Sequence, residues 1–322
     1  MIFSLVVTRW LHWTACILLT SSQLFRVYLL PQKQVTEGQN VQLWREAFLS
    51  RLRRFDHAAW VVALLSLCAW FAVTAWNMIG PDESLDISLI STIAVQTQLG
   101  RVSIARLVIL ALAGLCLFVL GRSTSTKKGR VSRLAAMGLV ALNLVMLALV
   151  GHVAARTSPA GGLLLAVDAI HLGAASVWPG GLVFFALLLR STIASPSSGL
   201  RALAARATRR FSASSLVTVA ILSITGLTIS LFFIHDVSDL WKTTYGQLLS
   251  AKVLVVCGMI AFGAQNLLIL KHRVELEARR ENASQETGAV RALFRNVLWE
   301  LALGGGVILI VAVLGITGPP HH

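Results

Sequence analysis

Long runs of apolar residues alternate with short polar segments along most of the chain. The runs are about 20 residues long, the length that a helix needs to cross the hydrocarbon core of a bilayer. The pattern predicts an all-α fold, a polytopic membrane helix bundle of eight transmembrane helices that forms a single integral membrane domain over residues 1–322. The predicted spans cover residues 3–27, 57–79, 100–120, 134–154, 163–189, 211–235, 248–270 and 297–317.

The composition supports a membrane protein and argues against a soluble one. Hydrophobic residues make up 56% of the chain and charged residues 13%, about half the charged share of a soluble domain. The first apolar run contains Arg9 and His12, and no small-residue cleavage site follows it, so we expect a retained helix rather than a signal peptide. The cysteines lie within apolar runs and show no spacing typical of a disulfide.

The net charge of +14 is informative about topology because of where the basic residues fall. Four alternate segments, 26–56, 121–133, 190–210 and 271–295, hold 22 of the 28 Lys and Arg residues. Basic residues collect in cytoplasmic loops, so the pattern predicts that these segments are cytoplasmic and that both termini lie on the outer side. An even number of spans agrees with that orientation, and the charge does not point to nucleic acid.

Several ionisable residues fall inside the predicted spans, where they are costly and are functional candidates by default. From the outer surface, His12 lies about 13 Å deep and His171 about 12 Å deep at 1.5 Å of rise per residue. Asp168 is one turn shallower on the same face as His171, and His152 lies near the outer end of the fourth span. These four side chains share one outer layer if their helices are adjacent.

These residue types suit a transition metal. Neutral imidazole is the commonest protein ligand of such metals, and a carboxylate ligates or orients an imidazole. We therefore predict a metal site formed by His152, His171, His12 and Asp168. Cys16 lies one turn after His12 and is a possible accessory soft ligand for Cu(I), and His235, at the outer end of the sixth span, is a second possible accessory ligand.

Structural roles compete with metal binding at each of these positions. A buried histidine can simply bond to a neighbouring helix, Cys16 can pack as a small hydrophobe, and His235 can anchor the interface. Asp168 has three possible basic partners in its layer: Arg9, Arg106 and Lys252.

A second group of residues near the candidate site has a structural interpretation. Trp178, Gly180 and Gly181 follow His171 by one to three turns. Small residues let helices approach closely, and Pro179 together with the glycine pair is expected to kink or loosen the fifth span.

The motif "GHVAA…DAIHLGAASVWPGGL" resembles the signature of the CopD family, bacterial inner-membrane proteins of copper resistance and copper uptake. The opening "TRWLHW" and the later "RRFSASSLVTVAILSITGLTISL", "TTYGQLLSAKVLVV" and "NVLWELALGGGVILIVAVLGITGPP" are similar to other parts of the family. The resemblance implies eight transmembrane helices in the inner membrane, and family-like positions at His12, His152, His171 and the turn from Trp178 to Gly181. In an inner membrane, the outer side on which the charge pattern places both termini is the periplasm. The resemblance also implies copper movement from the periplasm inward, often beside a periplasmic CopC-like copper-binding protein, which we expect to be a separate chain.

Taken together, the sequence predicts a copper-handling membrane protein with a histidine-lined site and no enzymatic activity, since no nucleophile and base stand out. The oxidation state, Cu(I) or Cu(II), stays open, and so does any role of the terminal His321 and His322. Two alternatives remain. One is a membrane haem b protein with bis-histidine ligation for electron transfer. The other is a copper sensor or assembly subunit that does not transport.

Overall fold

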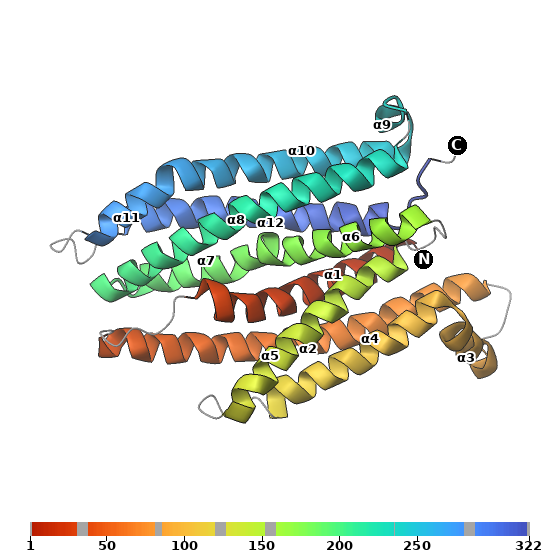
Figure 1. Cartoon of the computed structure of the whole chain (residues 1–322), viewed down its shortest axis with the longest axis horizontal. Coiled ribbons are helices and arrows are strands. Elements are labelled where there is room, and N and C mark those ends of the chain that lie inside the picture. The colour runs from red at the N-terminus through yellow and green to blue at the C-terminus, as the bar shows by residue number, and fades with distance from the viewer. Residues whose placement is uncertain are drawn as a thin grey trace.

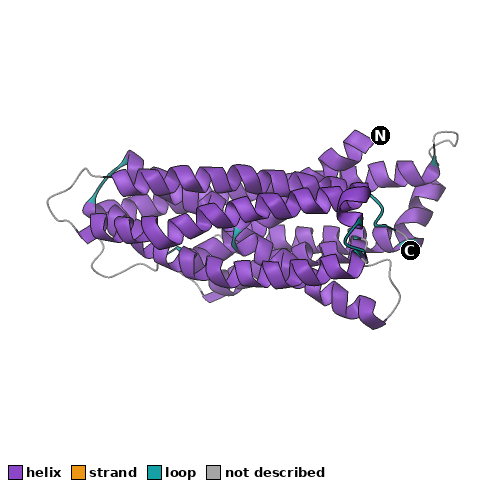
Figure 2. Cartoon of the chain, turned by 90° about the horizontal axis from the view of Figure 1, so that it is seen from above, coloured by secondary structure: helices purple, strands orange, loops and turns teal. Residues whose placement is uncertain are grey.

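The computed structural model describes residues 2–30, 38–80, 86–119, 127–151, 159–234, 236–279 and 287–320. These residues form helices, turns and loops, and they contain no strand (Figure 2). Eight of the helical segments are long and apolar enough to cross a membrane, which confirms the predicted all-helical bundle of eight spans. Many large apolar side chains on them face outward, as a lipid-facing surface requires; Leu254 and Leu268, for example, are each 74% exposed.

The α-helices of the described residues vary widely in length. They are α1 (Ile2–Leu24), α2 (Gln39–Ile79), α3 (Ile87–Gln96), α4 (Gln98–Gly114), α5 (Lys127–Val145), α6 (Pro159–Val177), α7 (Pro179–Ala194), α8 (Ser198–Phe233), α9 (Asp239–Lys242), α10 (Thr244–Gln265), α11 (Lys271–Arg279) and α12 (Gly288–Leu314). Short π-helical turns extend α1 over Phe25–Leu29, α4 over Leu115–Val119 and α10 over Asn266–Leu270, and a 3₁₀ turn extends α5 over Met146–Val150.

The bundle has two groups of helices, and α1 lies between them (Figure 1). One group consists of α2, α4 and α5, and the other of α6, α7, α8, α10 and α12. α1 packs against α2 and α5 on one side and against α6, α7 and α12 on the other. Side chains on the two faces of α1 therefore enter different environments.

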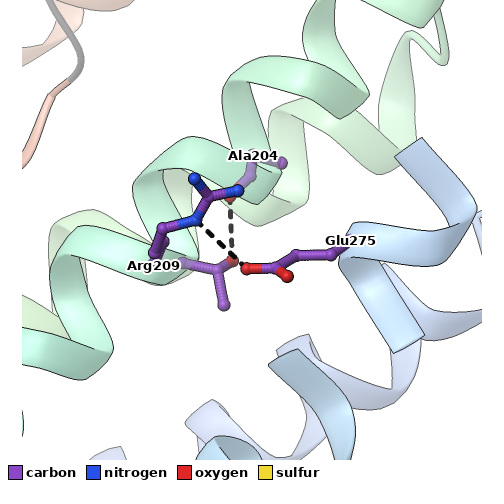
Figure 3. A network of polar contacts seen from close by, with 4 residues as sticks. Ala204, Arg209 and Glu275 are labelled. Atoms are coloured by element: carbon purple, nitrogen blue, oxygen red, sulfur yellow. Dashed lines mark hydrogen bonds and ion pairs between the residues drawn. The ribbon is translucent and has the colours of Figure 1, made fainter. Parts of the chain in front are cut away.

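Both termini lie at one end of the bundle, as an even number of spans requires (Figure 1). At the opposite end, α2 and α8 begin well before their apolar portions, so each helix is longer than its predicted span. There the Arg209 side chain of α8 reaches Glu275 of α11, with Nε 3.2 Å from Oε1 (Figure 3). The extra turns carry charged residues among buried apolar ones such as Val41 and Leu203, so a search for long apolar runs did not mark where these helices begin.

The fifth span is a broken helix. α6 ends at Val177 and α7 begins at Pro179. Proline is favourable at the first position of a helix, because the N–H group that it lacks would have no partner within the helix there. This interruption lies where the sequence predicts a kink or a loosening of the span. The chain also contains a short apolar helix, α3, that the sequence did not predict; Asp86 caps it by accepting a hydrogen bond from the backbone N–H of Ser88.

Candidate metal centre

His12 is fully buried and is bonded on both sides of its ring. Its Nδ1 lies 3.1 Å from the Ala63 carbonyl oxygen and 3.0 Å from Ser66 Oγ, both on α2. Its Nε2 lies 2.6 Å from a terminal nitrogen of Arg106 on α4. A guanidinium can only donate, so Nε2 accepts from Arg106 and the ring proton resides on Nδ1, which donates toward α2. His12 is therefore held as a neutral imidazole with its metal-binding lone pair directed at Arg106.

Cys16 lies one turn further along α1 and completes a compact polar cluster with His12. Its Sγ is 3.5 Å from His12 Nε2 and 3.3 Å from the Asn143 amide nitrogen of α5, and a terminal nitrogen of Arg106 lies 3.6 Å away. Cys16, Arg106 and Asn143 are each 1% exposed. Among the predicted site residues, the structure thus brings His12 and the accessory Cys16 together.

Arg106 holds this cluster to α5 as well as to α1. Its Nε donates to the Asn143 backbone oxygen at 3.2 Å and to the Asn143 side-chain oxygen at 3.3 Å. The sequence indicated Arg106 only as a possible partner of Asp168, and it gave no indication of a role for Asn143. Arg106 lies outside the four basic segments, and this unusual position was the available signal of a special role. The spacing of residues could not show toward which helix its side chain points.

Arg9 lies one turn from His12 toward the terminal end of the bundle. Its guanidinium carbon is 5.1 Å from the centre of the Trp70 ring, and the same indole is 5.7 Å from the His12 ring. Trp70 is thus packed between a cation and the cluster, and a cation over an indole face is favourable. This contact stabilises the Arg9 charge, while Arg9 Nε is buried without a hydrogen-bond partner in the described structure.

His171 and Asp168 lie on α6 and belong to a second polar cluster. His171 Nδ1 is 2.8 Å from Thr225 Oγ1 of α8, and that hydroxyl also lies 2.6 Å from the Ile221 carbonyl oxygen. The hydroxyl proton goes to the carbonyl, so Nδ1 donates to Thr225 and Nε2 carries the lone pair that a metal ion would use.

Lys252 of α10 provides the positive charge in this second cluster. It interacts electrostatically with both Asp168 and His171, and Asp168 in turn acts on Tyr245. Of the three basic residues considered for Asp168, Lys252 is the one that acts on it electrostatically. Gly226 faces the His171 ring, because a β-carbon there would lie 3.4 Å from its Cε1.

The two clusters face different helices. His12 and Cys16 contact α2, α4 and α5, whereas His171 and Asp168 face α8 and α10. Within the described ranges, no three His, Cys, Asp or Glu side chains lie close enough together to hold one metal ion. The predicted His152 and His235 lie outside the described residues, as do His321 and His322.

Trp178, Gly180 and Gly181 have packing roles at the break in the fifth span. A β-carbon on Gly180 would overlap the Ser21 hydroxyl of α1, and one on Gly181 would lie 3.1 Å from the Phe211 ring of α8. The two glycines therefore let α7 approach both neighbours closely. The buried Trp178 is hydrogen-bonded to Glu300 of α12, a contact that the sequence did not indicate.

Two family models match the chain, one in each half. The model for the N-terminal domain of copper resistance protein D-like proteins matches residues 1–163, about half of the chain. The model for copper resistance protein D matches residues 205–314. These matches cover both groups of helices and confirm the resemblance found in the motifs.

Two curated relatives have names that refer to copper. Copper resistance protein D of Pseudomonas syringae pv. tomato is 26% identical over 261 residues, which are 80% of this chain and 81% of that protein. Copper transport protein CutJ of Bacillus subtilis (strain 168) is 30% identical over 175 residues, which are 54% of this chain but only 29% of that protein. No solved structure matches the chain. With eight apolar spans and a family model matching about half of its length, this multi-pass membrane protein belongs to the copper resistance protein D family.

Proposed function

We propose that this protein is an inner-membrane copper carrier, not an enzyme, that moves copper from the periplasm toward the cytoplasm within one integral membrane domain. Family membership and the names of the two relatives support copper as the cargo. The concentration of basic residues in alternate segments supports periplasmic termini. In this orientation both polar clusters lie in the periplasmic half of the bundle.

The observation that carries the proposal is the buried pair formed by His12 and Cys16. An imidazole nitrogen and a thiol sulfur form a donor set that suits Cu(I), because thiolate is a soft ligand. With metal–ligand bonds of about 2.0–2.3 Å, donors this far apart subtend an angle of about 107° at a shared ion. Their separation of 3.5 Å therefore fits one ion without moving α1. Copper binding requires Arg106 to release the His12 lone pair.

The second cluster provides an entry position, because Asp168 lies about one turn nearer the outer surface than His171. We propose that copper arrives from a separate CopC-like periplasmic protein and first meets His152, Asp168 and His171. The free lone pair on His171 Nε2 and the carboxylate of Asp168 support that role. Lys252 repels a cation at this position, and it repels doubly charged Cu(II) more strongly than singly charged Cu(I). Cu(I) is therefore the better cargo.

Copper stoichiometry on the purified protein tests the site. We expect His12→Ala and Cys16→Ser each to lose the tightest Cu(I) in a competition assay with a chromophoric chelator. His57→Ala is the matched control, because His57 packs against Phe118 with ring centres 3.9 Å apart. Parental copper binding in both cluster variants would refute this site. His152→Ala and His171→Ala test the entry position in the same way.

Copper uptake by proteoliposomes then tests transport. A carrier accumulates copper in the vesicles, and a sensor or assembly subunit does not. An absorption spectrum with a Soret band would instead support a haem protein.

A further inference from the structure

A buried carboxylate lies away from both polar clusters, near the middle of α12. Glu300 is 1% exposed. Its Oε1 accepts a hydrogen bond from the Asn266 amide at 2.5 Å, and the Trp178 indole bonds to the same carboxyl group. In the described part of the chain no Lys or Arg is paired with it, and no other titratable side chain from α7, α8, α10 or α11 acts on it. An ionised carboxylate in this position lacks a counter-charge, which is costly inside a membrane.

The amide that holds Glu300 belongs to a fixed chain of hydrogen bonds. The Asn296 amide nitrogen donates to Asn266 Oδ1 at 3.1 Å and to Gln265 Oε1 at 2.7 Å. These bonds orient Asn266 so that its own nitrogen points at Glu300. Asn266 also opens the π-helical turn at the end of α10, and such turns are frequent at functional sites. One side of the carboxyl group is thus fixed, and the other is left to a cavity.

This cavity has a volume of about 140 Å³ and lies between α8, α10 and α12. Apolar side chains form most of its lining, and Trp178, Glu300 and hydroxyl-bearing residues of α8, including Ser212 and Ser215, contribute polar groups. Ser215 Oγ is buried and has no hydrogen-bond partner in the described structure. Since a water molecule occupies about 30 Å³, the cavity has room for a few waters that would bond to this hydroxyl and to the carboxyl group.

Gly263 keeps the second carboxyl oxygen accessible. It lines the cavity, and a β-carbon there would lie 3.6 Å from Glu300 Oε2 and 3.9 Å from the Trp178 ring. These are ordinary contact distances, so an alanine fits without strain but occupies space beside the oxygen. The glycine thus leaves space beside this oxygen of Glu300.

We propose that Glu300 is a proton-binding site, hydrated through this cavity, that couples proton movement to copper movement. The inference rests on the proposed function. A proton is favoured over a metal ion because, among the described residues, Glu300 is not part of any group of three His, Cys, Asp or Glu side chains. Protonation of Oε2 removes the uncompensated charge, and deprotonation returns the proton to cavity water. Glu, Asp and His serve such relay roles in transporters.

The position of α10 connects this site with the outer cluster. Lys252 and Asn266 lie on one continuous helix, 14 residues or about 21 Å apart. α10 also packs against α12 along its length. When copper enters the outer cluster, its charge changes the electrostatic interactions of Lys252. Lys252 lies on α10, the helix whose other end contacts Glu300.

The test uses proteoliposomes that contain a copper indicator and a pH indicator. We expect the wild-type protein to move protons when copper is added, and Glu300→Gln to reduce that proton movement by at least tenfold. Glu275→Gln is the control, because it neutralises a carboxylate of a peripheral ion pair (Figure 3) and should leave both signals unchanged.

A second variant keeps the carboxyl group and obstructs only the cavity. We expect Gly263→Ala to slow proton movement several-fold. Gly305→Ala is the matched control, because a β-carbon on Gly305 meets nothing within 4 Å. This pair keeps the inference testable if Glu300→Gln does not fold. Equal proton movement in Gly263→Ala and Gly305→Ala would contradict a route through the cavity.

The outcomes separate this inference from the proposed function. Copper uptake without proton movement, or proton movement unchanged in Glu300→Gln, overturns the inference and leaves copper transport intact. Failure of copper uptake by the wild type overturns the proposed function. Infrared titration then decides the proton site independently: a protonated-carboxyl band that shifts in D₂O and is absent from Glu300→Gln supports it. An identical band in that variant refutes it.

Discussion

Arg106 competes with copper for His12 in this structure, and that competition can be measured. Its guanidinium occupies the His12 Nε2 lone pair at 2.6 Å, in a pocket where the two side chains are 1% and 0% exposed. We predict that Arg106→Met strengthens Cu(I) binding, because methionine fills much of the same volume but donates no hydrogen bond. The variant releases the lone pair without removing either proposed ligand.

The magnitude follows from the bond that is removed. A hydrogen bond to a charged group contributes about 1.5–3 kcal/mol, which corresponds to about a tenfold to hundredfold change in a dissociation constant. Repulsion acts in the same direction. Two unit positive charges about 4 Å apart repel by about 4 kcal/mol at an effective dielectric constant of about 20. A tenfold gain in affinity is therefore the smallest change consistent with competition by Arg106.

Competition with a chromophoric Cu(I) chelator in detergent measures this affinity. Arg101→Met is the matched control, because Arg101 lies on the same helix but is exposed. The double variant Arg106→Met with His12→Ala should lose the gain. Unchanged or weaker copper binding by a folded Arg106→Met protein would refute the reasoning, since Arg106 would then support the site or the ion would bind elsewhere.

Three further predictions concern packing and charge. Gly180→Ala should lower the free energy of unfolding, measured by thermal denaturation in detergent, by about 1–3 kcal/mol, because the new β-carbon would overlap α1 where α7 approaches it. Asp56→Ala should lower the free energy of unfolding by about 3 kcal/mol in the same assay. It removes the partner of Arg26, whose terminal nitrogen lies 2.5 Å from Asp56 Oδ2, and leaves the arginine charge without that ion pair. Hydrogen bonds from the Ser88 side chain and backbone lower the pKa of Asp86. The cap that it forms on α3 is therefore present at neutral pH and is lost as the pH falls through the lowered pKa, which faster amide exchange in α3 would report.

The apolar pattern determined the number of spans because a bilayer imposes one length and one composition on every crossing helix. It did not determine where α2 and α8 begin, since their first turns interrupt the apolar pattern with charged residues and lie beyond the long apolar stretch. The proline and glycines at 179–181 did predict the break in the fifth span, because their backbone effects are local. Local rules of this kind need no knowledge of neighbouring helices.

The polar residues inside the spans were also visible in the sequence, since each violates the apolar pattern on its own. Helical spacing correctly paired His12 with Cys16, because the two lie one turn apart on one helix. Only the tertiary structure decided which helix each side chain faces. α1 directs His12 toward α2 and α4, whereas α6 directs His171 toward α8. Rotation of a helix about its axis is set by packing against its neighbours, which no single-helix pattern contains.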